Sequence, residues 1–444
     1  MGKRRLIRRF VALAAVSLLL PLCSAQLRQV PEPAVGAAAA SQDDYIVTFQ
    51  PGLSQAERAA AVVRAGANAR FNFSIINAVA VRVPNANVLA AIQRDMRVVS
   101  IVPDRPVHAF GKPTKPGGGS SGQVVPEGVK RVNTPVLGSS DGSGIAVAVL
   151  DTGIDLNHAD LAIGSSRFDA FGGSCQDGNG HGTHVTGIIA ALDNSIDVVG
   201  VAPNATPYCV KVLDDGGSGS DSAVIAGLDW VYNRTDLQIR VVNMSLGRDK
   251  VDGDMALDSP MRAAIRQLYA KGIIVVAAAG NEAAKEVIQK VPAGYPEVLA
   301  VASTTAKDGS NACRLLPNPI RKDTASFFTT DGSLDSTSDG SIGVTISAPG
   351  EDQENVSRGC LISSVGILSL KAGGGTIRYS GTSMAAPHVT GIVARVLQKE
   401  LAVGPEGVRG YFQANASAKQ TAPLDSPTST YTFDGEREGV AVAP

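Results

Sequence analysis

Five uninterrupted apolar runs follow residue 123, and segments with helical spacing lie between them. A strand with solvent on one face alternates apolar and polar residues, so a run without alternation indicates a strand buried on both faces. Such strands need helices on both sides of their sheet, and residues 222–233 and 259–271 have the spacing of helices. We therefore expect an α/β protein with a doubly wound, mostly parallel sheet. The five runs are residues 145–150, 210–213, 241–246, 273–279 and 298–303.

A smaller unit precedes this sheet. Between residues 43 and 109, strand-like and helical segments alternate in a β-α-β-β-α-β-like order, which predicts a small α+β, ferredoxin-like domain. Its first helix begins at Ser54 and has Glu57 three residues later, the signature of a capping box. Glycine and proline dominate residues 111–122, which indicates a linker. The expected strands are 45–49, 78–83 and 98–102, and the expected helices are 54–65 and 86–94.

The N-terminus has the pattern of a secretory signal peptide. Five basic residues precede an apolar run at 10–22, and small residues follow it. The run is shorter than the roughly 20 residues that a membrane-spanning helix needs. We therefore predict cleavage near Ala25, a secreted protein, and no membrane association after cleavage. Residues 26–42 are rich in alanine and proline and are expected to be a leader linker.

The charge of the chain is divided unevenly. Its 444 residues include 40 basic and 41 acidic ones, a formal charge of −1 that argues against nucleic acid as a partner. Residues 26–122 carry ten basic and six acidic side chains, whereas residues 123–444 carry 25 basic and 35 acidic ones. Opposite net charges favour association of these two parts, mainly through their rate of encounter.

Four cysteines remain after removal of the signal peptide, and none of them has the C-x-x-C spacing of a metal site. An even number in an exported chain favours two disulfides. Four cysteines allow three connectivities, and we expect the pairs that are nearest in sequence, Cys175–Cys209 and Cys313–Cys360.

Three polar clusters stand at the ends of expected buried elements. Asp151 directly follows an apolar strand, at the edge where ligands gather in open α/β sheets. His181 and His184 open a helix after a glycine-rich stretch, and Ser383 lies at a loop-to-helix junction. Taken singly, Asp151 would be a turn residue or helix cap and Ser383 an ordinary helix cap.

Two other chemistries are disfavoured by residue spacing. The two histidines are three residues apart and could bind zinc from one face of a helix, but no H-E-x-x-H motif is present. The G-x-S-x-G elbow of α/β-hydrolase esterases and lipases is absent, because Ala385 stands where its second glycine would be.

In chain order the three clusters supply Asp, His and Ser, one of the orders in which the serine triad occurs. Segments 151–153, 180–184 and 381–388 resemble the three active-site signatures of the subtilisin-like serine proteases, or subtilases. The resemblance covers residues 123–415, and residues 43–109 are similar to the inhibitory prodomain of that family. It implies a doubly wound parallel sheet, endopeptidase activity on polypeptides, a propeptide that assists folding, and often structural calcium.

The resemblance also implies residue roles. Ser383 would be the nucleophile, His181 the general base and Asp151 the residue that orients His181. The Asn281 side chain and the Ser383 N–H would donate to the oxyanion, and no cofactor would be required for catalysis. The substrate backbone would pair as an extra strand with two segments. These substrate-binding residues are Ser245, Leu246, Gly247, Ala278, Ala279 and Gly280.

Three features are left open by the residues themselves. Lys290 borders the primary specificity pocket in the resemblance, and it would either favour acidic substrate side chains or be a solvated surface lysine. Asp214, Asp215 and Asp221 could offer oxygen ligands to calcium, or form an acid-rich loop. Residues 305–341 are expected to be a surface loop, and the longer stretch 305–380 either a disulfide-pinned loop near the cleft or a surface excursion.

The expected organisation is therefore a signal peptide (1–25), a propeptide with its linker (26–122), a catalytic domain (123–420) and a polar C-terminal tail (421–444). The propeptide should act as chaperone and inhibitor, with autocleavage between about Phe110 and Gly122. We expect a monomer. The alternative is a catalytically silent subtilase-like protein that binds peptides, against which the intact residues Asp151, His181, Ser383 and Asn281 speak.

Overall fold

The computed structural model describes residues 43–116, 122–132, 140–316, 320–332, 343–429 and 437–444. The predicted signal peptide and leader linker lie outside these ranges. No helix within them is long and apolar enough to span a bilayer.

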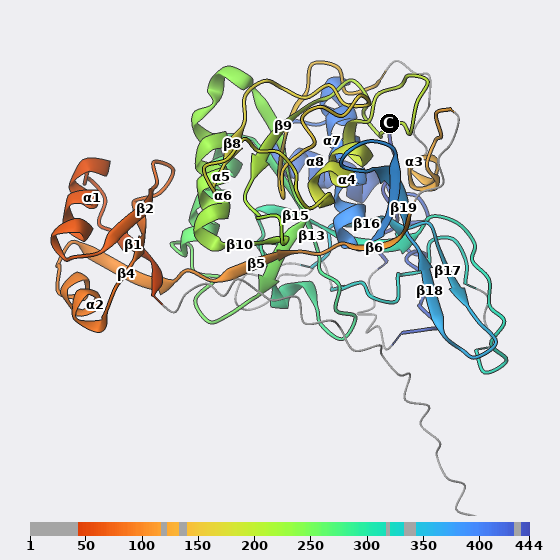
Figure 1. The fold of residues 1–444 in the computed structure, drawn as a ribbon. Helices are drawn as coiled ribbons and strands as arrows, with labels where there is room; N and C mark the ends of the chain where they lie inside the picture. The colour runs from red at the N-terminus through yellow and green to blue at the C-terminus, as the bar shows by residue number, and fades with distance from the viewer. Residues whose placement is uncertain (1–42, 117–121, 133–139, 317–319, 333–342, 430–436) are drawn as a thin grey trace, which may run out of the picture. The chain divides into compact units, whose positions relative to one another are not determined.

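A seven-stranded sheet forms the centre of the larger part of the chain (Figure 1), and every pairing in it is parallel. The uninterrupted apolar runs are its inner strands, which confirms the predicted sheet. All side chains of β7, β13 and β15 are buried, as strands covered on both faces require. In spatial order the strands are β16 (Ile346–Glu351), β15 (Val298–Thr305), β13 (Ile274–Ala278), β11 (Ile239–Met244), β7 (Ala146–Asp151), β9 (Thr206–Lys211) and β8 (Phe168–Asp169).

Helices cover both faces of this sheet. Val147 and Val149 of β7 pack in one core with α4, α7 and α8, whereas Ala148 and Leu150 pack in a second core with α5 and α6. Consecutive residues of one strand thus serve opposite layers, which is the doubly wound arrangement. The helices are α3 (Glu127–Arg131), α4 (His181–Ala190), α5 (Asp221–Asn233), α6 (Pro260–Ala270), α7 (Thr382–Gln398) and α8 (Gly404–Asn415), with short 3₁₀ turns at Thr235–Leu237 and Val287–Gln289.

Residues 44–103 form a separate antiparallel sheet with its own apolar core. Its strand order, β2-β3-β1-β4, and its β-α-β-β-α-β chain order confirm the predicted ferredoxin-like unit. Ser54 and Glu57 form the predicted capping box in both directions. The elements are β1 (Asp44–Phe49), α1 (Gln55–Arg64), β2 (Asn68–Asn72), β3 (Ala78–Arg82), α2 (Ala86–Gln93) and β4 (Val98–Pro103).

Two small sheets receive the chain that follows β4. β5 (Pro106–Ala109) belongs to the sheet β10-β5-β12-β14, and β6 (Lys112–Pro116) to the sheet β19-β20-β6. Within the expected linker, residues 112–116 pair as a strand with β20, which was not predicted. The remaining strands are β10 (Ser218–Ser220), β12 (Leu246–Asp249), β14 (Lys290–Val291), β17 (Gln353–Val356), β18 (Ile362–Val365), β19 (Ile367–Leu370) and β20 (Thr376–Ser380).

The two disulfides have the predicted pairing, Cys175–Cys209 and Cys313–Cys360. The second bond joins the loop after β15 to the connection between β17 and β18.

Two expectations about surface segments were wrong. Residues 324–326, from the supposed surface loop 305–341, are buried, and Ser326 donates its backbone N–H to Ser303 O in β15. The C-terminal tail also packs on the domain. Val440 is buried and pairs with Ser347 of β16. A polar composition did not predict exposure in these segments, because buried polar groups can form hydrogen bonds inside the fold.

Candidate active site

Asp151, His181 and Ser383 come from three elements that meet at one edge of the central sheet. Asp151 is the last residue of β7, His181 the first of α4 and Ser383 the second of α7. All three side chains are buried. The carboxyl ends of parallel strands and the starts of the following helices lie together in this fold, which brings residues far apart in sequence into one site.

Asp151 orients the imidazole of His181. The distance from His181 Nδ1 to Asp151 Oδ1 is 2.7 Å, and the same oxygen accepts the backbone N–H of Thr152 at 2.7 Å. An ionised carboxylate only accepts hydrogen bonds, so Nδ1 carries the proton and Nε2 is free to accept one. This is the tautomer that a general base needs.

Ser383 Oγ is held by two backbone groups. It donates to Ser245 O at 2.9 Å and accepts from the N–H of Phe110 at 3.0 Å. Within the described residues His181 Nε2 has no hydrogen-bond partner. Gly111 lies beside that nitrogen instead, because a Cβ added to Gly111 would stand 2.7 Å from it.

The carbonyl oxygen of Phe110 accepts a hydrogen bond from the side chain of Asn281. Asn281 Nδ2 donates to Phe110 O, while Asn281 Oδ1 accepts from both the N–H and the hydroxyl of Thr382 at 2.9 Å. The two bonds from Thr382 fix which end of the amide faces Phe110. Gly381 closes the site from behind, with φ at 149° and room for no side chain, since a Cβ there would lie 2.3 Å from Phe110 O.

The segment before Phe110 lies as a strand between two others. β5 pairs antiparallel with β12 through Leu246 and Gly247, and on its other edge with β10, residues 218–220. Residues 278–280, which were predicted to pair with a substrate strand, do not pair with β5, because β10 is its second neighbour. Gly280 instead donates its N–H to Thr382 Oγ1 at 3.1 Å, behind Asn281.

The side chain of Phe110 lies against Gly247, where a Cβ would stand 2.9 Å from two ring carbons. Lys290 lies nearby, against Gly280, and is only 2% exposed, so the prediction of a solvated surface lysine was wrong. Its ammonium pairs at 2.6 Å with Asp249 and at 2.6 Å with Glu282. Two carboxylates therefore neutralise the charge that would have favoured acidic substrates.

Asp177 connects the strand that carries Asp151 to the helix that carries His181. Its carboxylate is buried and accepts five hydrogen bonds. One comes from the hydroxyl of Thr152, which itself accepts the N–H of Gly182 in α4 at 2.9 Å. An acidic residue just before a helix start was the available sequence signal, although no role was predicted. The donors to Asp177 are the Thr152 hydroxyl, the backbone of Asn179 and Gly180, and both the backbone and hydroxyl of Thr183.

His184 does not share a ligand position with His181. Its ring stacks on Tyr379 at 4.6 Å between centroids, and its Nε2 lies 3.0 Å from Ile367 O. Burial lowers the pKa of His184 to about 3, with a further contribution from His181, so the ring is neutral and donates to Ile367.

The carboxylates considered for calcium do not converge. Asp221 pairs with Arg248 and Asp215 with Lys211, each at 2.8 Å, and Asp214 accepts backbone amides of its own turn. Among the residues that the structure describes, no group of three or more His, Cys, Asp or Glu side chains is arranged to hold a metal.

A different oxygen-rich cluster lies at the start of the larger domain. Gln123 Nε2 faces Leu192 O at 2.7 Å, Val198 O at 3.4 Å and Asn194 Oδ1 at 3.5 Å. Asp160 Oδ1 accepts from Asn194 Nδ2 at 2.6 Å, and burial raises the pKa of Asp160 to about 6. We call these five residues the Gln123 cluster. The cluster was not predicted, because backbone carbonyls supply some of its oxygen atoms and any residue type can supply a backbone carbonyl.

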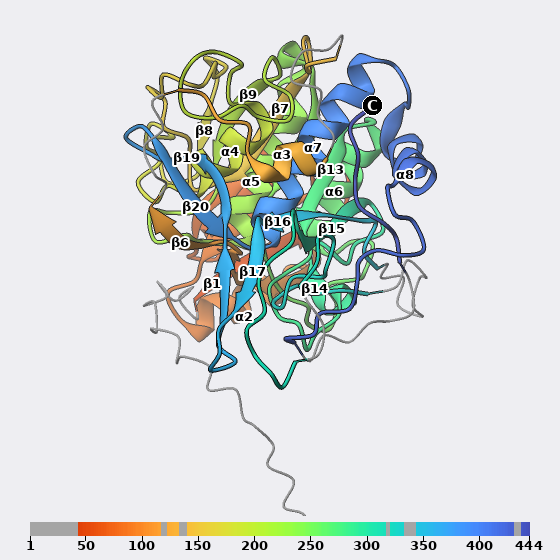
Figure 2. The ribbon, with the colours of Figure 1, turned by 90° about the vertical axis from the view of Figure 1, so that its right-hand side faces the viewer.

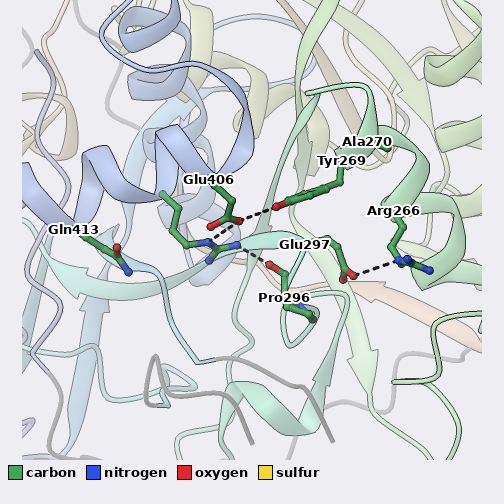
Figure 3. Close-up of a pocket in the computed structure, with 8 residues that line it drawn as sticks. Arg266, Tyr269, Ala270, Pro296, Glu297, Glu406 and Gln413 are labelled. Carbon is green, nitrogen blue, oxygen red and sulfur yellow. Dashed lines mark hydrogen bonds and ion pairs between the residues drawn. The ribbon is translucent and has the colours of Figure 1, made fainter.

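A cavity of about 520 Å³ lies between α6 and α8 (Figure 3), away from the triad. The polar groups that line it already have hydrogen-bond partners. Tyr269 donates to Glu406, and Arg409 donates to Pro296 O at 2.7 Å. No residue of the triad lines it, so it is not the catalytic cleft.

Known proteins resemble this chain over most of its length. Residues 142–431 match the model of the Subtilase family. Subtilisin E of Bacillus subtilis (strain 168) is 33% identical over 387 residues, which cover 85% of this chain and 86% of that protein. Alkaline elastase YaB of Bacillus sp. (strain YaB) is 39% identical over 298 residues, 66% of either protein.

A solved structure shows the same fold. Fervidolysin from Fervidobacterium pennivorans, a keratinolytic enzyme related to subtilisin, superposes with a TM-score of 0.63 at 24% sequence identity. The match covers 86% of this chain and 58% of that one.

Proposed function

The chain belongs to the subtilase family of serine endopeptidases, and we propose that Asp151, His181 and Ser383 form the catalytic triad of a secreted protease made as an autoprocessed zymogen. The match to subtilisin E extends over 85% of the chain, which includes the N-terminal unit as well as the catalytic domain.

The site supports acyl transfer to Ser383. As Ser383 Oγ attacks a substrate carbonyl, His181 Nε2 takes the hydroxyl proton, and Asp151 stabilises the imidazolium that forms. Asn281 donates to the oxyanion. His181 then protonates the leaving amine, and water hydrolyses the acyl-enzyme by the reverse proton route. For the first step Ser383 Oγ has to turn from Ser245 O, its acceptor at 2.9 Å, towards His181.

The first substrate is the chain itself, and the bond that we expect to be cleaved is Phe110–Gly111. One observation carries this proposal: Asn281 donates to the carbonyl of Phe110, whose N–H donates to Ser383 Oγ at 3.0 Å, and Gly111 lies beside His181 Nε2. This is the placement of a scissile peptide before attack. It narrows the predicted interval from 110–122 to a single bond.

The N-terminal domain would remain bound after that cleavage and inhibit the enzyme. Asp229 of α5 accepts from the hydroxyl of Ser74 and from the N–H of Ile75, both at 2.6 Å. Asp104 accepts from the N–H and hydroxyl of Ser222 at 2.8 and 2.6 Å, in the first turn of α5. A carboxylate at a helix N-terminus is stabilised by the free amides there, so the N-terminal domain caps a helix of the enzyme that it inhibits.

The same placement suggests the preferred side chain before the cleaved bond. The Phe110 ring lies on Gly247, and the nearby cation, Lys290, is neutralised by Asp249 and Glu282. We therefore expect preference for an aromatic or large apolar residue. A digest of a peptide library that showed an acidic preference would contradict this.

Structural calcium is proposed at the Gln123 cluster. Carbonyl, carboxylate and amide oxygens are the donors that Ca²⁺ prefers. Rotation of the Gln123 amide would turn its oxygen towards the place that its nitrogen now occupies, which Asn194 Oδ1 already faces. The cluster links Gln123, near the expected mature N-terminus, to the loop after α4. The ion would stabilise the fold and take no part in the reaction.

The test is labelling of processed protein by a fluorophosphonate probe, combined with casein cleavage and with mass measurement of the processed N-terminus. Labelling that is lost in Ser383→Ala, with a mature chain that begins at Gly111 or within the following linker, supports the proposal. If processed wild-type protein neither reacts with the probe nor cleaves casein, the protein is instead a silent peptide-binding relative.

A further inference from the structure

A hairpin extends from one end of the central sheet. β16, the strand at that end, is followed after one residue by β17, which pairs antiparallel with β18. Figures 1 and 2 show the β17–β18 hairpin extending away from the central sheet. The reaction steps described above use no residue of this hairpin, so its function has to be sought elsewhere.

The turn of the hairpin is held by the loop that follows β15. Cys360 in the turn is bonded to Cys313 in that loop, and their Cα atoms are 4.9 Å apart. The N–H of Ala312 donates to Val356 O at 2.8 Å, beside the disulfide. Cys313 and Val356 are buried in a small core with Ile320. Two segments that are 47 residues apart in sequence therefore present their side chains in one place.

Two leucines are exposed beside this disulfide. Leu315 is 79% exposed and Leu361 is 63% exposed, although the neighbouring Leu316 packs against the small core. The short chain distances from the two cysteines place the Cα atoms of Leu315 and Leu361 no more than about 16 Å apart. A single exposed leucine is ordinary on a protein surface, whereas large apolar side chains gathered on an ordered loop indicate an interaction site.

The surroundings of the disulfide are also basic. Arg314 and Arg358 are exposed, and within the described residues neither guanidinium has an ion-pair partner. The catalytic domain as a whole has more acidic than basic residues, so positive charge gathers here against the trend of the domain. Four basic residues and one acidic residue lie in the stretches 308–316, 320–322 and 357–361.

We propose that the hairpin tip, which consists of Arg314, Leu315, Arg358 and Leu361, binds the surface of a membrane that contains anionic lipids. The guanidinium groups match the charge of lipid phosphates and can donate hydrogen bonds to them. The leucines would enter the boundary between headgroups and acyl chains and leave water. An acidic polymer would satisfy the arginines but leave the leucines in water, so a lipid surface fits the tip better.

The attachment would be reversible, since two leucines and a few basic groups do not make a stable anchor. Because the disulfide and the small core already order the tip, little conformational entropy is lost on binding. This inference does not depend on the proposed proteolysis. It replaces the expectation from the sequence that the protein has no membrane association after removal of the signal peptide.

Vesicle binding tests the proposal without proteolysis. The Ser383→Ala chain, without its signal peptide, is sedimented with vesicles of phosphatidylcholine alone or of phosphatidylcholine and phosphatidylglycerol in equal parts. It should bind the mixed vesicles more tightly, and added salt should weaken that binding because exposed charges are screened. Equal binding to both kinds of vesicle, or binding to neither, would overturn the proposal.

Substitution of the leucines assigns the binding to the tip. Leu315→Ser combined with Leu361→Ser should weaken binding to the mixed vesicles by roughly 10-fold or more. The matched control is Leu257→Ser combined with Leu401→Ser, which removes two leucines that are 57% and 51% exposed elsewhere and should bind as the parent does. The basic N-terminal domain is present in every protein compared, so its own contribution to binding is the same throughout.

Substitution of the arginines and a soluble polyanion distinguish lipid from polymer. Arg314→Gln combined with Arg358→Gln should weaken binding to the mixed vesicles by roughly 5- to 30-fold. Heparin carries negative charge but has no acyl chains. If the arginine variant loses heparin binding while the leucine variant binds the mixed vesicles as the parent does, the tip is a site for polyanions and the lipid proposal fails.

Fluorescence locates the tip in the bilayer. Leu315→Trp adds a tryptophan to a chain that contains one other, Trp230. Its emission should shift to shorter wavelength on binding to the mixed vesicles, because the indole leaves water, whereas Leu257→Trp should show no shift. Bound protein without a shift at position 315 would show that another surface makes the contact and would overturn the assignment.

Discussion

Gly111 lies so close to His181 that one added carbon on its Cα would stand 2.7 Å from Nε2. A second contact of that carbon would be with Met384 Cε at 3.2 Å. Position 111 therefore has no room for a side chain in this arrangement.

Gly111→Val in the full chain should slow cleavage of the Phe110–Gly111 bond strongly, because the valine side chain displaces either the peptide or His181. The measurement is a time course of processing by mass spectrometry. Gly122→Val is the matched control, since a Cβ there meets nothing within 4 Å. Processing of both variants at the wild-type rate and position would rule out Phe110–Gly111 as the first bond cleaved.

Asn281→Ala should reduce kcat by about 10²- to 10³-fold, whereas Ser383→Ala should reduce it by ~2 × 10⁶-fold. Both magnitudes are those of the corresponding substitutions in subtilisin. In the proposed mechanism the Asn281 amide supplies one of the oxyanion donors, while Ser383 forms the covalent bond to the substrate. Initial rates on a peptide with Phe before the cleaved bond measure both. An Asn281→Ala enzyme as inactive as Ser383→Ala would show that Asn281 does more than donate to the oxyanion.

Asp177→Asn should lower kcat by roughly 10- to 100-fold with little change in KM. The substitution turns a charged acceptor of five hydrogen bonds into a neutral amide. It therefore weakens the bonds that hold the strand end with Asp151 and the helix start with His181 in position. The pH profile of kcat should shift as well, since the support of the imidazolium changes. Asp258→Asn, at an exposed aspartate, is the control. A variant with lowered thermal stability and normal kcat would assign Asp177 a structural role only.

A buried carboxyl pair behind Ser380 should make stability fall with rising pH. Burial, together with Glu354, raises the pKa of Glu351 from 4.5 to about 8. Between these values the folded protein keeps a proton that the unfolded chain has released, so the free energy of unfolding decreases as pH rises. Glu351→Gln removes this dependence, by up to about 1.4 kcal/mol per pH unit.

Urea unfolding of the Ser383→Ala protein, with and without Glu351→Gln, at about pH 5 and about pH 8 measures the effect. Glu400→Gln, at an exposed glutamate, should leave the slope unchanged. If the parent and Glu351→Gln proteins lose stability equally between the two pH values, Glu351 does not retain its proton in the folded state.

Calcium removal should lower Tm. A site filled at 100 times its Kd contributes about 2.7 kcal/mol, so a chelator should produce a clear shift in the wild-type protein. Asn194→Ala should already have the lower Tm and should not respond to the chelator, whereas Asp214→Ala should respond as the wild type does. A calcium response that persists in Asn194→Ala and disappears in Asp214→Ala would place the ion at the acidic loop instead.

The sheet could be predicted, and the three candidate catalytic residues could be located, because each depends on a short-range pattern. A strand covered on both faces has no polar alternation, and β7 shows this in its own six residues. Asp151, His181 and Ser383 each stand in a distinctive segment at the end of such an element. The Ser54 capping box was predictable for the same reason, since its two partners are three residues apart.

Features that depend on long-range pairing could not be predicted. The burial of Lys290 depends on Asp249, which is 41 residues away and lies in a strand paired with β14. The pairing of β5 with β10 and of β6 with β20 depends on register between segments more than 100 residues apart, for which composition carries no signal.

Gln123 already lies against Leu192 and Val198 while Phe110 still contacts Ser383. Residues on both sides of the proposed cleavage site thus already contact the catalytic domain in the uncleaved chain. We therefore expect cleavage of the Phe110–Gly111 bond to proceed without rearrangement of the catalytic domain. If the proposed processing is correct, we expect the delay before activity to equal the lifetime of the cleaved N-terminal domain on the enzyme, and we expect an added protease that digests that domain to shorten the delay.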